Sequence, residues 1–144
     1  MGRTRSMAAV GLAAALMAPA GAAAKPAPVA PLTVEILDHA KLDKRTGVAH
    51  VRTRVSCPVG YRVIIAELGG GQDKPVVSPG SGGIGRVVCD GRRHTVTSDS
   101  FAPGVFGEEE PAWRKGRLSV TATLIVDNGE ESLTAQDSET IKLH

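Results

Sequence analysis

A strict alternation of apolar and polar residues runs through the C-terminal part of the chain and constrains its fold more than any other feature. Residues 117–127, RLSVTATLIVD, alternate in this way, and most of residues 132–144, SLTAQDSETIKLH, stay in the same phase. A period of two over this length is typical of a strand with one buried face. Asn128 and Gly129 form the pair that a tight type I′ turn prefers. A β-hairpin is predicted, with an apolar face of Leu118, Val120, Ala122, Leu124 and Val126.

Five further segments have the composition of short strands, and clusters of Gly, Pro and Asp separate them. No segment of ten or more residues combines helical periodicity with helix caps. Seven strands in about 110 residues predict an all-β domain over residues 32–144, an antiparallel immunoglobulin-like β-sandwich. One feature of that fold is absent, because Trp113 does not lie in the strand that follows the first cysteine. The predicted strands are 32–42, 47–57, 61–68, 85–89, 93–98, 117–127 and 132–144.

The N-terminal residues have the layout of a secretory signal peptide. A short basic region, an apolar run over residues 7–17 and an Ala-x-Ala site ending at Ala24 follow one another. The apolar run is too short and too interrupted to span a membrane. We expect residues 1–24 to be removed, residues 25–31 (KPAPVAP) to form a disordered lead-in, and the protein to be secreted without a stable membrane anchor.

Removal of that leader changes the charge of the protein. The whole chain holds 17 Lys and Arg against 15 Asp and Glu, and the leader contains two of the arginines and no acid. The mature chain therefore has a formal net charge of zero. Nucleic-acid binding needs a concentrated basic surface, so the composition argues against a nucleic-acid partner. We expect a monomer with an extracellular partner or ligand.

The only two cysteines, Cys57 and Cys89, are expected to form a disulfide. Two thiols in a small exported β-domain usually pair in an oxidising compartment. A redox-active pair is more often C-x-x-C at a helix N-terminus, and a zinc site needs four ligands at recognisable spacings. The sequence has neither pattern, so we interpret the pair as a structural bridge and predict no metal site.

The segments around the cysteines also carry a resemblance. Residues 55–68 (VSCPVGYRVIIAEL), 87–106 (VVCDGRRHTVTSDSFAPGVF) and 118–126 (LSVTATLIV) are similar to a group of small secreted bacterial proteins of uncharacterised function, which have immunoglobulin-like β-sandwiches. The similarity extends over residues 33–143, and the C-P-x-G and C-D-G-x-x-H segments are its distinctive parts. It implies the fold and export, and it implies no activity or catalytic residue.

Residues 69–85 are expected to form a long, mobile, glycine-rich loop. Residues 80–85 (GSGGIG) match the dinucleotide-binding pattern G-x-G-x-x-G, but that motif must follow a strand and begin a helix. Here it precedes a predicted strand, so no cofactor is predicted. Loops of this length are often functional. A partner-binding role is therefore a hypothesis for Gly71, Gln72 and Asp73.

A second long connection, residues 101–116, holds three of the four aromatic residues: Phe101, Phe106 and Trp113. Clustered aromatics on a loop can form a recognition surface. They can equally fill the open end of a sandwich built from Val, Leu and Ala, which is the interpretation we favour. The acidic triplet Glu108–Glu110 is read as a solvated turn rather than a calcium site, because adjacent extended residues point in different directions.

No catalytic constellation is visible. The four histidines, His39, His50, His94 and His144, have no metal-ligand spacing, and His94 is expected to be partly buried and structural. The leading hypothesis is a secreted, non-catalytic domain that binds or has a structural role through its end loops. The alternative is a small extracellular hydrolase whose site assembles from dispersed residues near His94, such as Asp90 and Asp99.

Overall fold

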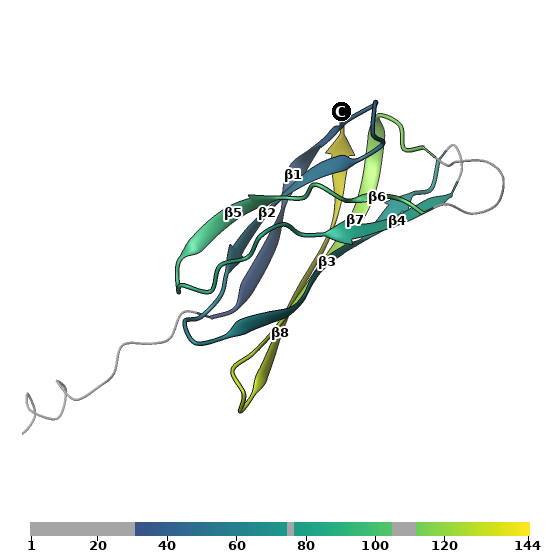
Figure 1. The fold of residues 1–144 in the computed structure, drawn as a ribbon. Helices are drawn as coiled ribbons and strands as arrows, with labels where there is room; N and C mark the ends of the chain where they lie inside the picture. Colours follow the sequence, from purple (N-terminus) through teal and green to yellow (C-terminus); the bar gives the residue numbers. More distant parts are fainter. Residues whose placement is uncertain (1–30, 75–76, 105–111) are drawn as a thin grey trace, which may run out of the picture.

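The computed structural model of the protein describes residues 31–74, 77–104 and 112–144 (Figure 1). The predicted signal peptide and all of the lead-in except Pro31 lie outside these residues. The described chain is all-β, as predicted. It forms eight strands: β1 (Thr33–Leu42), β2 (Ala49–Ser56), β3 (Arg62–Gln72), β4 (Ser78–Gly83), β5 (Arg93–Thr97), β6 (Ala102–Pro103), β7 (Gly116–Asp127) and β8 (Ser132–Leu143).

The strands belong to one curled sheet in the order β5-β2-β1-β8-β7-β3-β4-β6 (Figure 1). Neighbouring strands are antiparallel except β1 and β8, which pair in parallel at His39 with Lys142 and at Ala40 with Leu143. The prediction of a purely antiparallel sandwich is therefore corrected to a mixed sheet. The physical reason lies in β1. Its register against β2 shifts between Ile36 and Ala40, and the strand lies between β2 on one side and β8 on the other, so that it joins the two halves.

The two edges of the curl are joined by residues 93–103. β5 pairs with β2, and after it the chain crosses to β6, which pairs with β4. On the way, the main-chain N–H of Ala49 donates to the carbonyl oxygen of Phe101 at 2.7 Å. The core lies inside the curl and takes the alternating apolar residues of β7 as predicted, together with side chains of the other strands. Its most deeply buried members include Val51, Leu68, Ile84, Phe101, Leu118, Leu124 and Leu143.

The prediction of a loop over residues 69–85 is wrong, because most of these residues form the β3–β4 hairpin. Gly69 pairs with Ser81, and Gly71 pairs with Pro79. The glycines provide close approach between strands. A Cβ atom on Gly70 would lie 2.0 Å from the carbonyl oxygen of Ser119, and one on Gly80 would lie 2.4 Å from Trp113 Cζ2. These residues are small because neighbours from distant parts of the chain occupy the space.

The predicted strand at 85–89 is also wrong, since these residues form no strand. Cys89 is bonded to Cys57 just beyond β2, and the N–H of Gly91 donates to the carbonyl oxygen of Cys57 at 2.9 Å. Gly85 lies against β5, where an added Cβ would be 2.9 Å from the Thr97 carbonyl oxygen. The disulfide and this contact place the segment beside the sheet without a strand ladder.

Candidate functional site

The Cys57–Cys89 disulfide is present, as predicted. Cys57 is fully buried and Cys89 is half-buried, and neither thiol is free. The bridge fixes the segment before β5 to the end of β2. A bonded pair with one fully buried member is typical of a structural disulfide.

The predicted aromatic plug is formed by Phe101 and Trp113. The two rings lie 4.6 Å apart between centroids with an interplanar angle of 56°, and both are buried. Trp113 Nε1 donates to the carbonyl oxygen of Ser78 at 2.9 Å, which satisfies the buried indole N–H. These two rings fill the interior, so neither presents a face to a partner. Phe106 and the triplet Glu108–Glu110 lie outside the described residues.

Gln72, predicted as a contact residue in a loop, is a buried clamp. Its Oε1 accepts a hydrogen bond from the N–H of Arg114 at 2.8 Å, and its Nε2 donates to the carbonyl oxygens of Arg114 and Arg117. Gly71 approaches β4 so closely that a Cβ would lie 2.1 Å from the carbonyl oxygen of Ser78. Asp73, the third predicted contact residue, is exposed. The clamp holds the basic segment before β7 against the end of β3.

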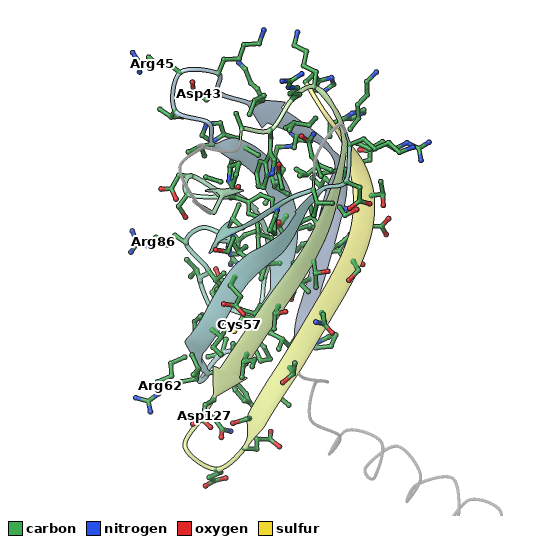
Figure 2. The ribbon with its side chains drawn as sticks, turned by 90° about the vertical axis from the view of Figure 1, so that its right-hand side faces the viewer. Asp43, Arg45, Cys57, Arg62, Arg86 and Asp127 are labelled. Atoms are coloured by element: carbon green, nitrogen blue, oxygen red, sulfur yellow. A yellow bond between two sulfur atoms is a disulfide. The ribbon has the colours of Figure 1, made fainter. Side chains whose placement is uncertain are left out.

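Around this clamp lies a surface that we call the basic end. Three hollows of about 540, 290 and 870 Å³ adjoin one another there through Lys115, Arg117 and Thr140. Figure 2 shows nitrogen-tipped side chains gathered at the end of the molecule opposite Asp127. The exposed cations of the basic end are Lys44, Lys74, Arg114, Lys115, Arg117 and Lys142.

None of these six cations forms an ion pair with another described residue. Two carboxylates, Asp38 and Asp73, line the same hollows. Asp43 lies in the nearby turn after β1, where the N–H of Arg45 donates to its carboxylate and lowers its pKa. Among the described residues the cations outnumber these acids, so this part of the surface carries an excess of positive charge.

The turn at the opposite end of the molecule combines carboxylates with a nearby arginine, because Arg62 pairs with Asp127 across the β3–β7 ladder. The β7–β8 turn carries Asp127, Glu130 and Glu131. The hydroxyl of Ser132 and then the N–H of Gly129 donate to the Asp127 carboxylate and lower its pKa. Among the described residues, the cations without ion-pair partners at the basic end are thus gathered in one place. Composition could not reveal this, because it sums charges that the fold separates.

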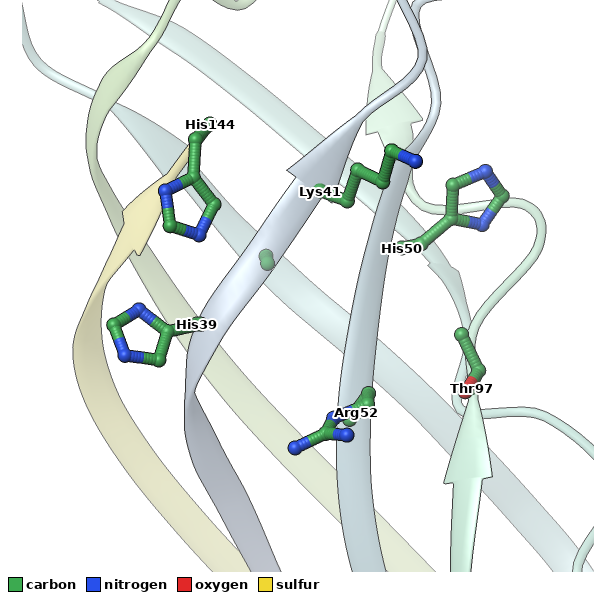
Figure 3. A pocket seen from close by; sticks show the side chains of 7 residues that line it. His39, Lys41, His50, Arg52, Thr97 and His144 are labelled. Carbon is green, nitrogen blue, oxygen red and sulfur yellow. The ribbon is translucent and has the colours of Figure 1, made fainter.

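A fourth hollow, of about 520 Å³, crosses β8, β1, β2 and β5 beside the basic end (Figure 3). We call it the histidine hollow, because three of the four histidines line it. The His39 and His144 rings stack with centroids 5.3 Å apart and planes 21° apart. The hollow is lined by His39, Ala40, Lys41, His50, Arg52, Thr97 and His144.

Strand register creates the histidine hollow. His39 pairs with Lys142 across the parallel β1–β8 ladder, and Lys41 pairs with His50 across the β1–β2 ladder. His50 Nδ1 lies 2.9 Å from the carbonyl oxygen of Ser98, which orients its ring. The sequence predicted no shared site for the histidines, because they have no metal-ligand spacing along the chain. Only knowledge of which strands are neighbours would have grouped them.

The residues of the hydrolase hypothesis are brought together in part. His94 Nε2 lies 2.8 Å from Asp90 Oδ2, and His94 is partly buried, as expected. The N–H of Arg92 and then His94 donate to Asp90 and lower its pKa. Asp99 is exposed beyond the end of β5. None of the four hollows includes His94 or Asp90.

Residues 31–74, 77–104 and 112–144 lack two kinds of feature. No three His, Cys, Asp or Glu side chains among them are grouped so as to hold a metal ion. The same residues include no helix with the length and apolar character needed to cross a membrane.

Fold and site together define an all-β, disulfide-stapled domain with a cationic surface at one end. Comparisons with known protein families, with curated proteins and with solved structures found no match for this chain.

Proposed function

We propose that this protein is a secreted, non-catalytic domain that binds an acidic polysaccharide through its basic end. The six cations of that surface, which lack ion-pair partners among the described residues, are the observation that carries the proposal. Unpaired cations around adjoining hollows form a positive surface that attracts and retains an anionic polymer. The disulfide supports an oxidising extracellular location.

The polar groups among the cations favour a sugar polymer. Ser119 and Thr140 line the largest of the three hollows beside Arg117, and a hydroxyl group can both donate a hydrogen bond to a sugar hydroxyl and accept one from it. Binding of single-stranded nucleic acid normally uses exposed aromatic side chains on which bases stack. Among the described residues, the aromatic side chains near this end are Phe101 and Trp113, and both are buried. A carboxylated or sulfated polysaccharide requires no such stacking surface.

The clamp of Gln72 makes the surface suitable for binding. A binding surface loses less conformational entropy when its main chain is already fixed. Gln72 fixes residues 114–117 through three hydrogen bonds, so Arg114, Lys115 and Arg117 extend from an ordered main chain. Each exposed cation contributes about 0.2–1 kcal/mol in such a setting, so affinity depends on several acting together.

We also propose that the curled sheet is a variant of the immunoglobulin-like sandwich. One half consists of β5, β2 and the start of β1, and the other of β8, β7, β3 and β4. The register shift in β1 lets this strand contribute to both halves. In this interpretation, the basic end is one end of a sandwich, where such domains commonly carry binding loops.

Salt-dependent retention on heparin, hyaluronan and neutral dextran tests the polysaccharide proposal. The secreted protein should be retained by an acidic polymer and pass through dextran. The K115Q/R117Q variant should elute at lower salt, with the slope of log affinity against log salt reduced by about one for each lost contact. The matched control is R62Q/R86Q, which removes two exposed arginines outside the hollows and should elute like the wild type.

Three results would overturn the proposal. The first is passage of the wild type through both acidic columns. The second is an equal loss of retention in K115Q/R117Q and R62Q/R86Q, which would show that overall charge, rather than the basic end, determines binding. The third is binding to phosphatidylglycerol vesicles without binding to either polymer, which would assign the surface to membranes.

The E108Q/E109Q/E110Q variant should bind at least as tightly as wild type, because carboxylates in the same chain can only compete with the polymer.

A further inference from the structure

Two of the three hollows at the basic end share a wall. The hollows of about 540 and 870 Å³ are both lined by Gly116, Arg117 and Thr140, so they adjoin one another at these residues. Gly116 contributes no side chain to this wall, and nothing lies within 4 Å of the place where its Cβ would be. A chain-like ligand can therefore extend from one hollow into the other past Arg117.

Each of the two hollows contains a carboxylate as well as cations. Asp73 lines the larger hollow with Lys74 and Lys115, and Asp38 lines the smaller one with Lys142. Among the described residues, neither carboxylate lies within ion-pair distance of a lysine or an arginine. An ionised carboxylate can only accept hydrogen bonds. The two acids therefore suit the hydroxyl groups of a sugar and repel a sulfate or a carboxylate.

A row of uncharged polar side chains continues from the shared wall along β7 and β8, and we call it the neutral stripe. Its β7 members alternate with buried residues of that strand and so face outward. Thr121 Oγ1 lies 2.9 Å from Ser138 Oγ, and Gln136 Nε2 donates to Thr123 Oγ1 at 3.3 Å. The stripe consists of the cross-strand pairs Ser119–Thr140, Thr121–Ser138 and Thr123–Gln136.

The strand on the other side of β7 adds no cation beside the neutral stripe. Gly71 and Gly69 of β3 pair with Ser119 and Thr121, and Glu67 pairs with Thr123. Along this part of the described sheet, positive charge therefore ends at Arg117. A polymer that lies along β7 and β8 meets cations at one end only, so a polymer with a sulfate on every sugar would leave most of its charges without a partner.

The order of charges across the shared wall matches an alternating polymer. The guanidinium group of an arginine can donate two parallel hydrogen bonds to a carboxylate, which fits Arg117 to an acidic sugar. Asp73 and Asp38 line the hollows that adjoin Arg117, where the sugars before and after the acidic one would lie. Neutral sugars at these two places present hydroxyl groups to the carboxylates and avoid the repulsion.

We propose that the basic end selects a polysaccharide in which carboxylated sugars alternate with neutral ones, and that Asp38 and Asp73 make this selection against densely sulfated polymers. The inference rests on the polysaccharide proposal and narrows its ligand. Cations attract either kind of polymer. The two carboxylates and the neutral stripe distinguish between them, because they tolerate a neutral sugar and not a charged one.

Calorimetry with hyaluronan and heparin oligosaccharides of equal length tests the inference at one salt concentration and one pH. Hyaluronan alternates a carboxylated sugar with a neutral one, and heparin carries sulfate groups along its whole length. The wild type should bind the hyaluronan oligosaccharide about ten-fold more tightly than the heparin one. Hyaluronan whose carboxyl groups have been reduced to alcohols should bind more weakly than hyaluronan itself, because Arg117 loses its anionic partner.

The D38A/D73A variant should change the two affinities in opposite directions. Its hyaluronan affinity should fall by about ten-fold, because two hydrogen-bond acceptors for sugar hydroxyls are lost. Its heparin affinity should rise, because two repulsive charges are removed. The matched control is D99A/E130A, which removes two exposed carboxylates outside the hollows and should leave the ratio of the two affinities as in the wild type. Thermal unfolding of each variant confirms that it is folded.

Heparin binding that is as tight as hyaluronan binding, or tighter, would overturn the inference and leave the polysaccharide proposal in place. An unchanged or higher hyaluronan affinity in D38A/D73A would also overturn it, because that result is expected if the two acids act only through their charge. If neither oligosaccharide binds the wild type, the polysaccharide proposal itself fails, and the inference fails with it.

Discussion

Asp137 on β8 accepts a hydrogen bond from the main-chain N–H of Ile36 on β1 at 2.8 Å. The two strands pair directly only at His39 with Lys142 and at Ala40 with Leu143. At one end of this pairing, main-chain hydrogen bonds join Leu42 and Ala40 to His144. Toward the other end, the Asp137 side chain joins the two strands in place of a ladder hydrogen bond. The Asp137 carboxylate thereby satisfies the main-chain N–H of the buried residue Ile36, where the register of β1 against β2 begins to shift.

Replacement of Asp137 should show how much this bridge contributes. Asp137→Leu leaves the Ile36 N–H without its partner, so we expect the free energy of unfolding to fall by about 1–3 kcal/mol. Asp137→Asn keeps an acceptor oxygen and should lose less. Urea unfolding measures both, with Glu139→Leu, a change at an exposed position on the same strand, as the control. An equal loss in Asp137→Leu and Glu139→Leu would show that the bridge contributes nothing.

Two adjacent glycines in β3 should respond differently to alanine. Gly70 has a φ of 135°, and its Cβ would lie 2.0 Å from the Ser119 carbonyl oxygen, whereas Gly69 has nothing within 4 Å of its Cβ. Gly70→Ala should lower stability by several kcal/mol or prevent folding, because main-chain atoms must move. Gly69→Ala should be neutral or slightly stabilising. Thermal unfolding compares them, and similar melting temperatures would contradict the packing explanation.

Thr53 is fully buried, and its hydroxyl has no hydrogen-bond partner among the described residues. A buried hydroxyl without a partner is costly, and valine has nearly the same shape. Thr53→Val should therefore raise the free energy of unfolding by about 1 kcal/mol. Thr53→Ser keeps the hydroxyl and removes a methyl group, so it should lower stability by about 1 kcal/mol. Denaturant unfolding that ranks serine above valine would show that the hydroxyl is satisfied in solution.

Asp127 should contribute to the pH dependence of stability. The Ser132 hydroxyl and the Gly129 N–H lower its pKa in the folded protein below the ordinary value of 3.8. A carboxyl group with a lowered folded pKa stabilises the fold above its unfolded pKa, and this contribution is lost as the pH falls through the folded pKa. The loss in melting temperature from pH 7 to pH 3 should thus be smaller in Asp127→Asn than in wild type. An unchanged difference would contradict the assignment.

Local patterns in the sequence were sufficient for part of the fold. The alternation of residues 117–127 predicted β7, because each residue's face follows from its immediate neighbours. The disulfide followed from the expected oxidising compartment and the presence of only two cysteines. The β3–β4 hairpin was missed because its glycines resemble those of a loop. Glycine is needed at position 70 because Ser119 leaves no room for a side chain, and at position 80 because Trp113 lies against it. Both neighbours are far away in the sequence.

The candidate sites were harder to predict for a related reason. Lys74 and Lys115 line one hollow because the β3–β4 and β7 segments meet at one end of the molecule. His39, His50 and His144 meet because β8 and β2 both flank β1. The spacing of these residues along the chain does not indicate that they lie close together in the fold. The predicted contact residues Gly71 and Gln72 were close to the basic end, but their role there is to hold it in place.

The parallel pairing of β1 with β8 has a consequence for how the protein reaches its folded state. β1 is the first described strand and β8 the last, and their ladder is the place where the two halves of the sheet meet in the strand order. A chain that emerges from a ribosome or a translocation channel N-terminus first therefore exposes the β8-facing edge of β1 until the final strand has emerged. Contacts between residues so far apart in the sequence form slowly. A strand edge that stays unpaired during this time can pair with another chain and cause aggregation. The charged residues Asp38 and Lys41 near that edge provide protection during this interval, because charged side chains discourage pairing with other chains.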